Sequence, residues 1–195
     1  MPCSTHLPHI IKVLREYLAV FPDKLSKGLA PKRPHDHDIL PVPEKLPEKY
    51  AICLMTPDQL KFHNQEIAKL SDNRLIGTTY SPICSPTIMV DKHDDGSGEP
   101  KMRMVVNYSA LNAPTIAPEF QLPSLQTILE VQGGAKYFSI LDLEAGFHQI
   151  RMAKEVRWRT AFRSVLGVFE YRVMPCGLKC SPVMFQANMP INSLY

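Results

Sequence analysis

The residue that most clearly invites a chemical role is Asp142. It ends a dense apolar stretch over residues 137–141 and is followed shortly by Gly146. That composition is typical of a buried strand, so the carboxylate would point from the edge of a sheet into a cleft. A hard divalent cation such as Mg²⁺ takes one or two such carboxylates, together with phosphate oxygens and water. Spacing alone favours a simpler role, an aspartate that ends a strand and caps a turn, so the metal interpretation depends on its surroundings.

A run of basic residues between positions 151 and 172 is a second chemical feature. The only acidic residues in this stretch are Glu155 and Glu170. Its basic residues are Arg151, Lys154, Arg157, Arg159, Arg163 and Arg172. Charge alone is consistent with a phosphate-binding surface and equally with an ordinary solvated face.

Cysteine and histidine offer two other candidate metal sites. Cys176 and Cys180 have no second cysteine pair with which to complete a zinc site, so they are interpreted as free thiols of a reduced compartment. The His-Asp-His-Asp run over residues 35–38 could hold a metal ion. Its simpler interpretation is a polar lead-in to an extended segment at residues 39–40.

The composition describes a chain that can build a core. It has 195 residues, 45% of them hydrophobic, and a net charge of +3, which permits an anionic partner without requiring one. No apolar run reaches the ~18 residues needed to cross a bilayer, and no basic segment followed by an apolar one opens the sequence. We therefore expect no membrane partner, no secretory signal and an intracellular location.

Prolines restrict the helices that can position these residues. Eighteen prolines against nine glycines exclude long helices from much of the first two-thirds of the chain. Helical spacing of apolar residues predicts an amphipathic helix within residues 5–20, followed by a Pro-rich connector over residues 22–55. Thr56, followed by proline and an acid, is typical of a helix start, and this helix is predicted to run to Leu70.

Strands are predicted from short apolar runs between turn signals. The first two form a hairpin whose tip lies within residues 91–101, which are rich in glycine and aspartate. A short helix opens at Ser124 and closes at Gly133-Gly134, and a last helix opens at Ser181. The predicted strands cover residues 88–90, 102–108, 137–141, 148–152, 160–163 and 168–173.

Several sequence blocks follow one another in a recognisable order. Residues 103–112 read R-M-V-V-N-Y-S-A-L-N, residues 138–150 read F-S-I-L-D-L-E-A-G-F-H-Q-I, and residues 174–186 read M-P-C-G-L-K-C-S-P-V-M-F-Q. They resemble the R-M-x-V-D-Y-R-x-L-N, F-S-x-L-D-L-x-S-G-Y-H-Q-I and M-P-F-G-L-x-x-A-P-x-x-F-Q blocks of gypsy-type retrotransposon reverse transcriptases. Ordered blocks are far more specific than a single motif. Shorter matches extend the likeness to nearly the whole chain, at residues 80–86, 121–123, 133–138 and 160–163.

The resemblance implies a fold and a domain division. The expected class is α+β, a mixed α/β arrangement that forms a reverse-transcriptase-like fingers–palm fragment. Residues 1–55 would form an N-terminal helix and connector, residues 56–120 the fingers, and residues 121–195 a partial palm. The palm would have an antiparallel sheet with helices on one face.

The resemblance also assigns roles around Asp142. This aspartate would bind the catalytic Mg²⁺ ions, with Mn²⁺ as the alternative, and the backbone carbonyl of Leu143 would help to hold the nucleotide-bound ion. The backbone amides of Ala145 and Gly146 would meet the incoming triphosphate. Phe147 would lie under the sugar and exclude a 2′-hydroxyl, although without the motif its ring would be read as core.

Further nucleotide contacts are implied on the fingers and near the end of the chain. Arg103 would contact the triphosphate, since a planar guanidinium pairs well with phosphate oxygens. Without the motif, Arg103 would equally be interpreted as an exposed residue of a surface strand. Lys92, before the hairpin tip, is the expected second phosphate contact. Cys176 and Gly177 would border the nucleotide pocket.

The sequence departs from the family pattern in several places. Asn107 and Ser109 stand where the family has Asp and Arg, Cys176 replaces an aromatic residue, and the hairpin tip is long and acidic over residues 94–99. The Tyr-x-Asp-Asp motif that supplies the other carboxylates does not occur in this sequence. Two-metal phosphoryl transfer needs several carboxylates around cations ~4 Å apart. We therefore expect this chain alone to be truncated and inactive as a polymerase.

The partners implied are an RNA or DNA template–primer duplex, a dNTP and the remainder of a Pol polyprotein, meaning the rest of the palm, the thumb, RNase H and integrase. The implied location is a cytoplasmic virus-like particle or the nucleus. Two other interpretations stay open. One is a non-catalytic nucleic-acid-binding protein that uses the basic run over residues 151–172 on phosphates. The other is an inactive relic of a retroelement.

Overall fold

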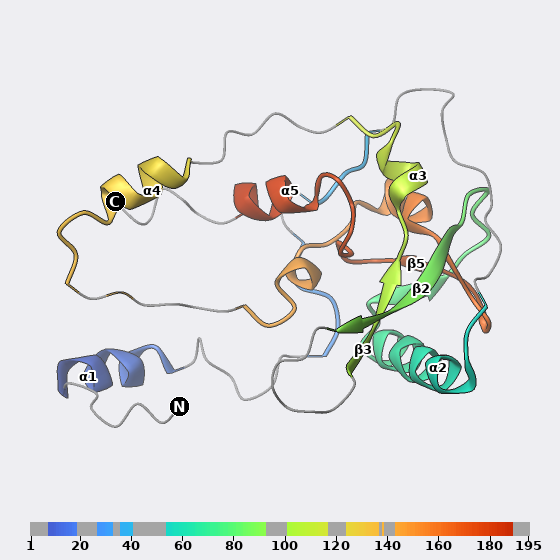
Figure 1. Ribbon diagram of the computed structural model, residues 1–195, viewed down its shortest axis with the longest axis horizontal. Helices are drawn as coiled ribbons and strands as arrows, with labels where there is room; N and C mark the ends of the chain where they lie inside the picture. Colours follow the sequence, from blue (N-terminus) through green and yellow to red (C-terminus); the bar gives the residue numbers. More distant parts are fainter. Residues whose placement is uncertain are drawn as a thin grey trace.

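The chain folds around one mixed β-sheet with helices beside it (Figure 1). This is a computed structural model, and it describes the chain from residue 8 to residue 188 with gaps. The described residues are 8–18, 27–32, 36–40, 54–92, 101–116, 124–136, 138 and 143–188. The expected mixed α+β class is confirmed.

The elements follow the order in which the sequence predicted most of them. The strands are β1 (Ile76–Thr78), β2 (Ser85–Lys92), β3 (Lys101–Val106), β4 (Phe162–Ser164) and β5 (Gly167–Tyr171). The helices are α1 (Pro8–Glu16), α2 (Pro57–Asp72), α3 (Ser109–Asn112), α4 (Leu125–Val131) and α5 (Ser181–Asn188). Two 3₁₀ helices are η2 (Gly146–Gln149) and η3 (Lys154–Thr160).

The sheet joins segments that are far apart in the sequence. Its strand order is β1-β5-β4-β2-β3, so β4 and β5 lie between strands from the first half of the chain. Three neighbouring pairs are antiparallel, including the predicted hairpin of β2 and β3. The pair β2–β4 is parallel and short, with Ser85 beside Phe162 and Pro86 beside Arg163. The sheet is therefore mixed: β4 and β5, which belong to the predicted palm, pair antiparallel, and the long connection between β2 and β4 supplies the crossover that parallel strands require.

The start of α2 is fixed by its own residues. Thr56 accepts a hydrogen bond from the Gln59 amide at 3.3 Å, and the Gln59 side chain accepts one from the Thr56 amide at 3.0 Å. Pro57 occupies the first turn. This reciprocal capping box satisfies two amides that the helix itself leaves without partners. The helix start predicted at this threonine is confirmed.

We expect Thr56→Ala to lower the free energy of unfolding by about 1 kcal/mol, because it removes the capping oxygen. Thr56→Ser keeps an oxygen in the same place and should lose much less. Urea denaturation of the two variants beside the parent chain measures both values. Equal losses for alanine and serine would show that the cap contributes nothing.

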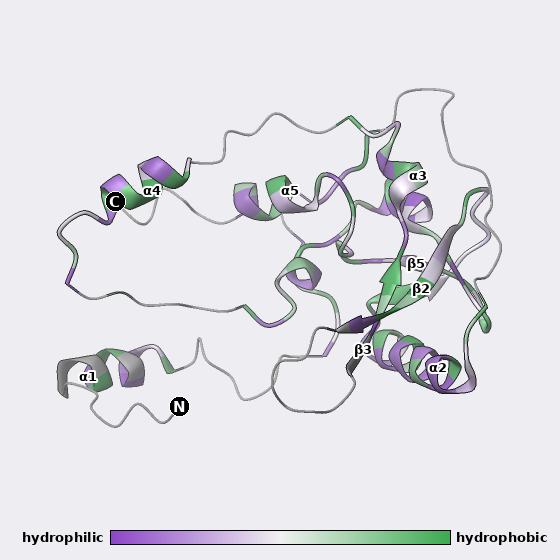
Figure 2. Cartoon of the chain, viewed as in Figure 1, coloured by the Kyte–Doolittle hydropathy of each residue, from purple (hydrophilic) through white to green (hydrophobic). Residues whose placement is uncertain are grey.

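The core lies where α2 and η3 meet the strands. α2 packs against β1 and β3, and η3 packs against β5. Figure 2 shows α2 with hydrophobic and hydrophilic residues on different sides, and its buried members are His63 and Ile67. The rings of Phe162 and Tyr171 lie 5.1 Å apart within this core. The Tyr108 hydroxyl donates to the Thr160 carbonyl at 2.9 Å, which ties the end of β3 to η3.

Two helices make little contact with this core. Figure 1 shows α1 and α4 away from the sheet, and all residues of α4 are exposed, among them Leu125 and Leu129. The predicted helices in both places are confirmed, with Ser124 capping α4 through the Thr127 amide. Among the described residues, no helix is both long and apolar enough to cross a membrane.

Two strand predictions fail in position. Residues 148–152 are not a strand, because η2 takes up His148, and Arg151 and Met152 make only isolated bridges. The left-handed backbone of Ala145, at φ 49° and ψ 41°, turns the chain into this tight helix. The strand predicted at residues 160–163 begins at Phe162, since η3 extends through Thr160. Most of the strand predicted at residues 137–141, all but Phe138, and most of the hairpin tip lie outside the described residues.

Candidate functional site

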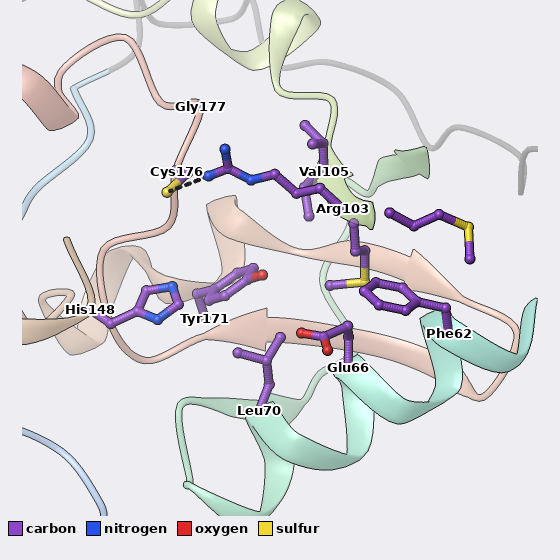
Figure 3. Close-up of a pocket in the computed structure, with 12 residues that line it drawn as sticks. Phe62, Glu66, Leu70, Arg103, Val105, His148, Tyr171, Cys176 and Gly177 are labelled. Carbon is purple, nitrogen blue, oxygen red and sulfur yellow. Dashed lines mark hydrogen bonds between the residues drawn. The ribbon is translucent and has the colours of Figure 1, made fainter. Parts of the chain in front are cut away.

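A pocket of about 420 Å³ opens between α2 and β3 (Figure 3). Its walls come from five separate parts of the chain: α2, β3, η2, β5 and the loop after β5. The lining residues are Phe62, Glu66, Leu70, Met102, Arg103, Met104, Val105, Val106, His148, Tyr171, Cys176 and Gly177. Three of them, Arg103, Cys176 and Gly177, are among the site residues that the sequence predicted.

Arg103 crosses the upper side of this pocket. It lies on β3 opposite Val90 of β2, and its exposed side chain extends toward the loop after β5. Its Nη2 donates to the Cys176 Sγ at 3.9 Å, the contact marked in Figure 3. A neutral thiol is a weak acceptor. The guanidinium therefore remains available to a stronger one, such as a phosphate oxygen.

Gly177 forms a sharp turn beside Cys176. Its φ of +94° lies in the region that favours glycine, and a Cβ there would stand 3.6 Å from the Val106 carbonyl oxygen. Space is thus adequate, and the backbone conformation is what requires glycine. The turn brings this loop against the end of β3, so the two segments that carry Arg103 and Cys176 meet.

The residues after Asp142 form a second group around η2. The Gly146 amide donates to the Leu143 carbonyl at 3.2 Å, so both backbone groups take part in the turn that begins η2. A Cβ on Gly146 would stand 3.1 Å from the Phe185 ring, which explains the need for a small residue. The Phe147 ring packs edge-on against Phe185 at 5.3 Å. That contact agrees with the alternative in which Phe147 serves the core.

The predicted site residues around η2 do not line the pocket that contains Arg103. His148, which follows Phe147, lines the pocket, whereas Ala145, Gly146 and Phe147 do not. Asp142 and the side chain of Lys92 lie outside the described residues. Leu143 is exposed.

Residues able to hold a metal ion do not gather in the described part of the chain. No group of three or more His, Cys, Asp or Glu side chains comes together there. Of the two predicted metal ligands, only Leu143 lies in the described part of the chain, and its carbonyl oxygen already accepts one hydrogen bond. A Mg²⁺ site needs several oxygen ligands in near-octahedral geometry. The described residues therefore do not assemble one.

Three polar residues of the pocket, Glu66, His148 and Tyr171, were not among the site residues that the sequence predicted. Glu66 lies on α2 and Tyr171 on β5, and nothing in their spacing links them to Arg103. Burial, and then the neighbouring Cys176 and Glu66, raise the pKa of Tyr171, so its hydroxyl stays protonated. Burial lowers the pKa of His148, so its ring is neutral near pH 7. His148 stands within the block around Asp142, a signal that could have pointed to it, although it was interpreted as structural.

The arrangement suits a ligand with an anionic end and a flat, partly apolar body. Arg103 offers the cationic side, while Phe62, Tyr171 and His148 offer ring surfaces (Figure 3). Apolar walls with a few oriented polar groups are the usual form of a small-molecule site.

Comparisons with known proteins show the family and the fold of this chain. The model of the family "Reverse transcriptase (RNA-dependent DNA polymerase)" matches residues 90–191, which are 102 of the 195 residues. Two Drosophila melanogaster relatives are the retrovirus-related Pol polyproteins from transposons 297 and gypsy. The first is 39% identical over 131 residues and the second 38% over 126. These matches cover 67% and 64% of this chain and 12% of each relative, so the chain spans about an eighth of their length.

Solved structures show the same fold. The native prototype foamy virus protease-reverse transcriptase superposes with a TM-score of 0.71 at 25% identity, and the match covers 94% of this chain and 24% of that one. A foamy viral protease-reverse transcriptase in complex with an RNA/DNA hybrid gives 0.69 at 21% identity, covering 92% and 23%. The family match spans both β3 with Arg103 and the loop with Cys176 and Gly177. This chain therefore belongs to the reverse transcriptase family.

Proposed function

We propose that this chain is the fingers and first palm segment of a retrotransposon reverse transcriptase, and that its pocket receives the triphosphate end of an incoming dNTP. In the whole enzyme, deoxynucleotides would be transferred to a primer 3′-hydroxyl under the direction of a template. The observation that carries the proposal is the meeting of Arg103 with Cys176 and Gly177 on the wall of one pocket. These residues come from two separate sequence blocks of the family.

Within this proposal, Arg103 binds phosphate oxygens through its planar guanidinium. Lys92, two residues after Val90, which pairs with Arg103, supplies a second cation. The amides of Ala145 and Gly146 approach the triphosphate from the η2 side. Phe147 lies beneath the sugar and excludes a 2′-hydroxyl. Its edge-on contact with Phe185 would hold the ring in one orientation for that task.

Reverse transcriptases use divalent metal ions. We propose Asp142 and the Leu143 carbonyl as ligands of Mg²⁺ or Mn²⁺, with further carboxylates supplied from outside this chain. The bound ion would polarise the phosphoryl oxygens and assist the attacking hydroxyl. Because the described residues do not assemble such a site, we assign no step of the reaction to it.

The proposed macromolecular partners are a template–primer duplex and the remainder of the Pol polyprotein: the rest of the palm, thumb, RNase H and integrase. Support for the duplex comes from a foamy viral relative of similar fold, which is described in complex with an RNA/DNA hybrid. The relatives matched by sequence are named as polyproteins. We propose a cytoplasmic virus-like particle or the nucleus as the location.

A second candidate function, nucleic-acid binding without polymerisation, is favoured by one observation. The pKa of Arg157 is lowered by burial and then by Arg151 and Arg172, so three guanidinium groups from the basic run lie near one another. Glu170 and Asp36 oppose that effect. Converging positive charge attracts phosphates, and such binding weakens steeply with salt.

Replacing Arg103 by alanine tests the first proposal. We expect the affinity of the chain for dATP with Mg²⁺ to fall about ten- to hundred-fold, because the loss of a charge-assisted hydrogen bond is of that size. Arg103→Lys should be intermediate, since a lysine keeps the charge and loses the planar fork. Isothermal titration calorimetry measures all three affinities.

Arg15→Ala is the matched control, because Arg15 is an exposed arginine on α1, away from the pocket. It should leave dATP affinity unchanged. Equal affinities for the parent chain and Arg103→Ala would count against the proposed pocket. Salt-sensitive binding of a template–primer duplex that is indifferent to Arg103 would then favour the second candidate.

A further inference from the structure

We infer that Asn112 is a positioning residue, which fastens the loop of Cys176 and Gly177 to the strand of Arg103 and so sets the width of the pocket. The inference rests on the proposed function for the identity of the ligand. The fastening itself follows from hydrogen bonds at the end of α3.

The Asn112 side chain holds the loop by both of its polar atoms. Its Nδ2 donates to the Gly177 carbonyl at 2.7 Å, and its Oδ1 accepts from the Lys179 amide at 2.8 Å. An amide is a donor on one side and an acceptor on the other, so only one orientation of Asn112 satisfies both contacts. One side chain thereby clamps two backbone groups that stand two residues apart in the same turn.

The loop is anchored at its two ends, where Pro175 and Leu178 are buried and the Ser181 hydroxyl donates to the Pro175 carbonyl at 3.0 Å, but its exposed middle depends on Asn112. Cys176 and Gly177 are exposed and belong to no strand or helix. Within the described part of the chain, no other hydrogen bond reaches the Gly177 carbonyl or the Lys179 amide. A further hydrogen bond joins this loop to the segment that follows Asn112, since the Lys179 Nζ donates to the Thr115 carbonyl at 3.0 Å.

Asn112 is itself rigidly placed relative to Arg103. α3 begins at Ser109, shortly after β3 ends at Val106, and the Asn112 amide donates to the Tyr108 carbonyl at 2.7 Å. Tyr108 is buried and bonded to Thr160, and Leu111 is fully buried. The path from Arg103 to Asn112 is therefore a continuous, packed segment.

The clamp accounts for the meeting of the two pocket walls. Arg103 approaches the loop from β3, and Asn112 pulls the same loop toward α3, so Cys176 comes within 3.9 Å of the guanidinium. Without the Asn112 side-chain amide, the Gly177 carbonyl would lose its hydrogen bond, and the exposed part of the wall opposite Arg103 would be less firmly positioned. A triphosphate bound between them would then lose part of its contact.

The test compares Asn112→Ala, Asn112→Asp and Asn73→Ala in the 195-residue chain. Asn112→Asp keeps an acceptor for the Lys179 amide but turns an oxygen toward the Gly177 carbonyl. Asn73→Ala is the matched control, since the Asn73 Nδ2 also donates to a backbone carbonyl, that of Lys69, at 2.9 Å. Three readouts are needed: hydrogen exchange of the Lys179 amide, alkylation rate of the Cys176 thiol, and affinity for inorganic triphosphate and for dATP.

We expect Asn112→Ala to speed Lys179 exchange about ten-fold and to accelerate Cys176 alkylation, because the loop opens locally. Triphosphate affinity should fall about five-fold, a change within the range of one lost hydrogen bond. Exchange within β2 and β4 should stay as in the parent chain. Asn112→Asp should weaken triphosphate binding while it retains more Lys179 protection, and Asn73→Ala should change none of these readouts.

Two results would overturn the inference. One is unchanged Lys179 exchange and Cys176 alkylation in Asn112→Ala. The other is a freed loop with unchanged triphosphate affinity, which would leave Asn112 a structural residue only. If the parent chain binds neither triphosphate nor dATP, the proposed function fails. Asn112 then retains no role in setting a nucleotide pocket, even where the exchange data show that it anchors the loop.

Discussion

Phe162→Ala is expected to lower the free energy of unfolding by about 3–5 kcal/mol. Phe162 is fully buried on β4, where its ring lies 6.0 Å from that of Phe169 and 5.1 Å from that of Tyr171. Its backbone stands beside Ser85 on one side and Phe169 on the other, at the centre of the sheet. Truncation would remove a large apolar side chain and leave a cavity that these paired strands cannot collapse around.

Urea denaturation followed by circular dichroism measures this change, with Leu166→Ala as the control. Leu166 lies in the turn between β4 and β5 and is 59% exposed, so its truncation should change stability by less than about 0.5 kcal/mol. A natural domain is stable by only about 5–15 kcal/mol, so a loss of about 3–5 kcal/mol would remove a large share of the stability of this chain. A loss near 1 kcal/mol would mean that the sheet closes over the gap.

Local signals explain the parts of the fold that the sequence predicted well. The cap at Thr56 and the apolar runs around the β2–β3 hairpin act over a few residues, so they can be read directly from the sequence. The helix start at Ser124 has the same local character, and α5 begins at the predicted Ser181. The resemblance added the family, which composition and spacing alone could not provide.

The pairing of distant segments could not be read in this way. The parallel contact of β2 with β4 joins Ser85 to Phe162 across a long stretch of chain, and no local pattern selects that partner. The same limit applies to Glu66 and Tyr171, which reach the pocket only because α2 packs beside the sheet. Within the strand predicted at residues 148–152, polar and apolar residues alternate from position 149, as in a strand, but the left-handed turn at Ala145 leads the chain into η2.

The candidate site also has one part that the sequence predicted and another part that depends on contacts between distant segments. The sequence blocks named Arg103, Cys176 and Gly177, and the fold brings them to one pocket. Their roles stay predictions, as does the role of Asp142, which lies outside the described residues. The blocks also contain Asn112, but its function depends on two backbone groups of another segment, which the sequence does not show to be adjacent.

Acid is expected to destabilise the chain through His37, by about 3 kcal/mol between pH 7 and pH 4. Burial lowers the pKa of His37 to about 4, and the charge of nearby Asp38 only partly opposes that shift. The side chain is fully buried, and neither ring nitrogen has a hydrogen-bond partner among the described residues. Protonation would therefore place a charge where no described group accepts its protons.

The direction of this pH dependence follows from the pKa of His37 in the unfolded and the folded chain. The unfolded chain takes up a proton at His37 near pH 6.5, whereas the folded chain resists until about pH 4. Unfolding is thus increasingly favoured as pH falls through this window. Below pH 4 both states are protonated, and His37 adds no further loss. The lowered pKa values of His63 and His148 act in the same direction, so the parent chain alone cannot isolate His37.

Protonation of His37 would also disturb the backbone contacts of the segment around it. Its amide donates to the Arg151 carbonyl at 2.7 Å, and its carbonyl accepts from the Ala153 amide at 2.9 Å, which holds the segment around residue 37 against the stretch between η2 and η3. Ile39, two residues later, is buried in the core. A charged His37 would push this segment outward and expose Met152, its neighbour in the bridge.

His37→Leu provides the comparison, because leucine has a similar volume and no proton to bind. Unfolding free energies from urea titrations at intervals between pH 4 and pH 8 should fall less steeply for His37→Leu, and the two curves should differ by about 3 kcal/mol more at pH 4 than at pH 7. Contributions from carboxylates and from the other histidines are common to both chains and cancel in that difference. Parallel curves would mean that His37 titrates alike in the folded and unfolded states, and that its burial carries no acid sensitivity.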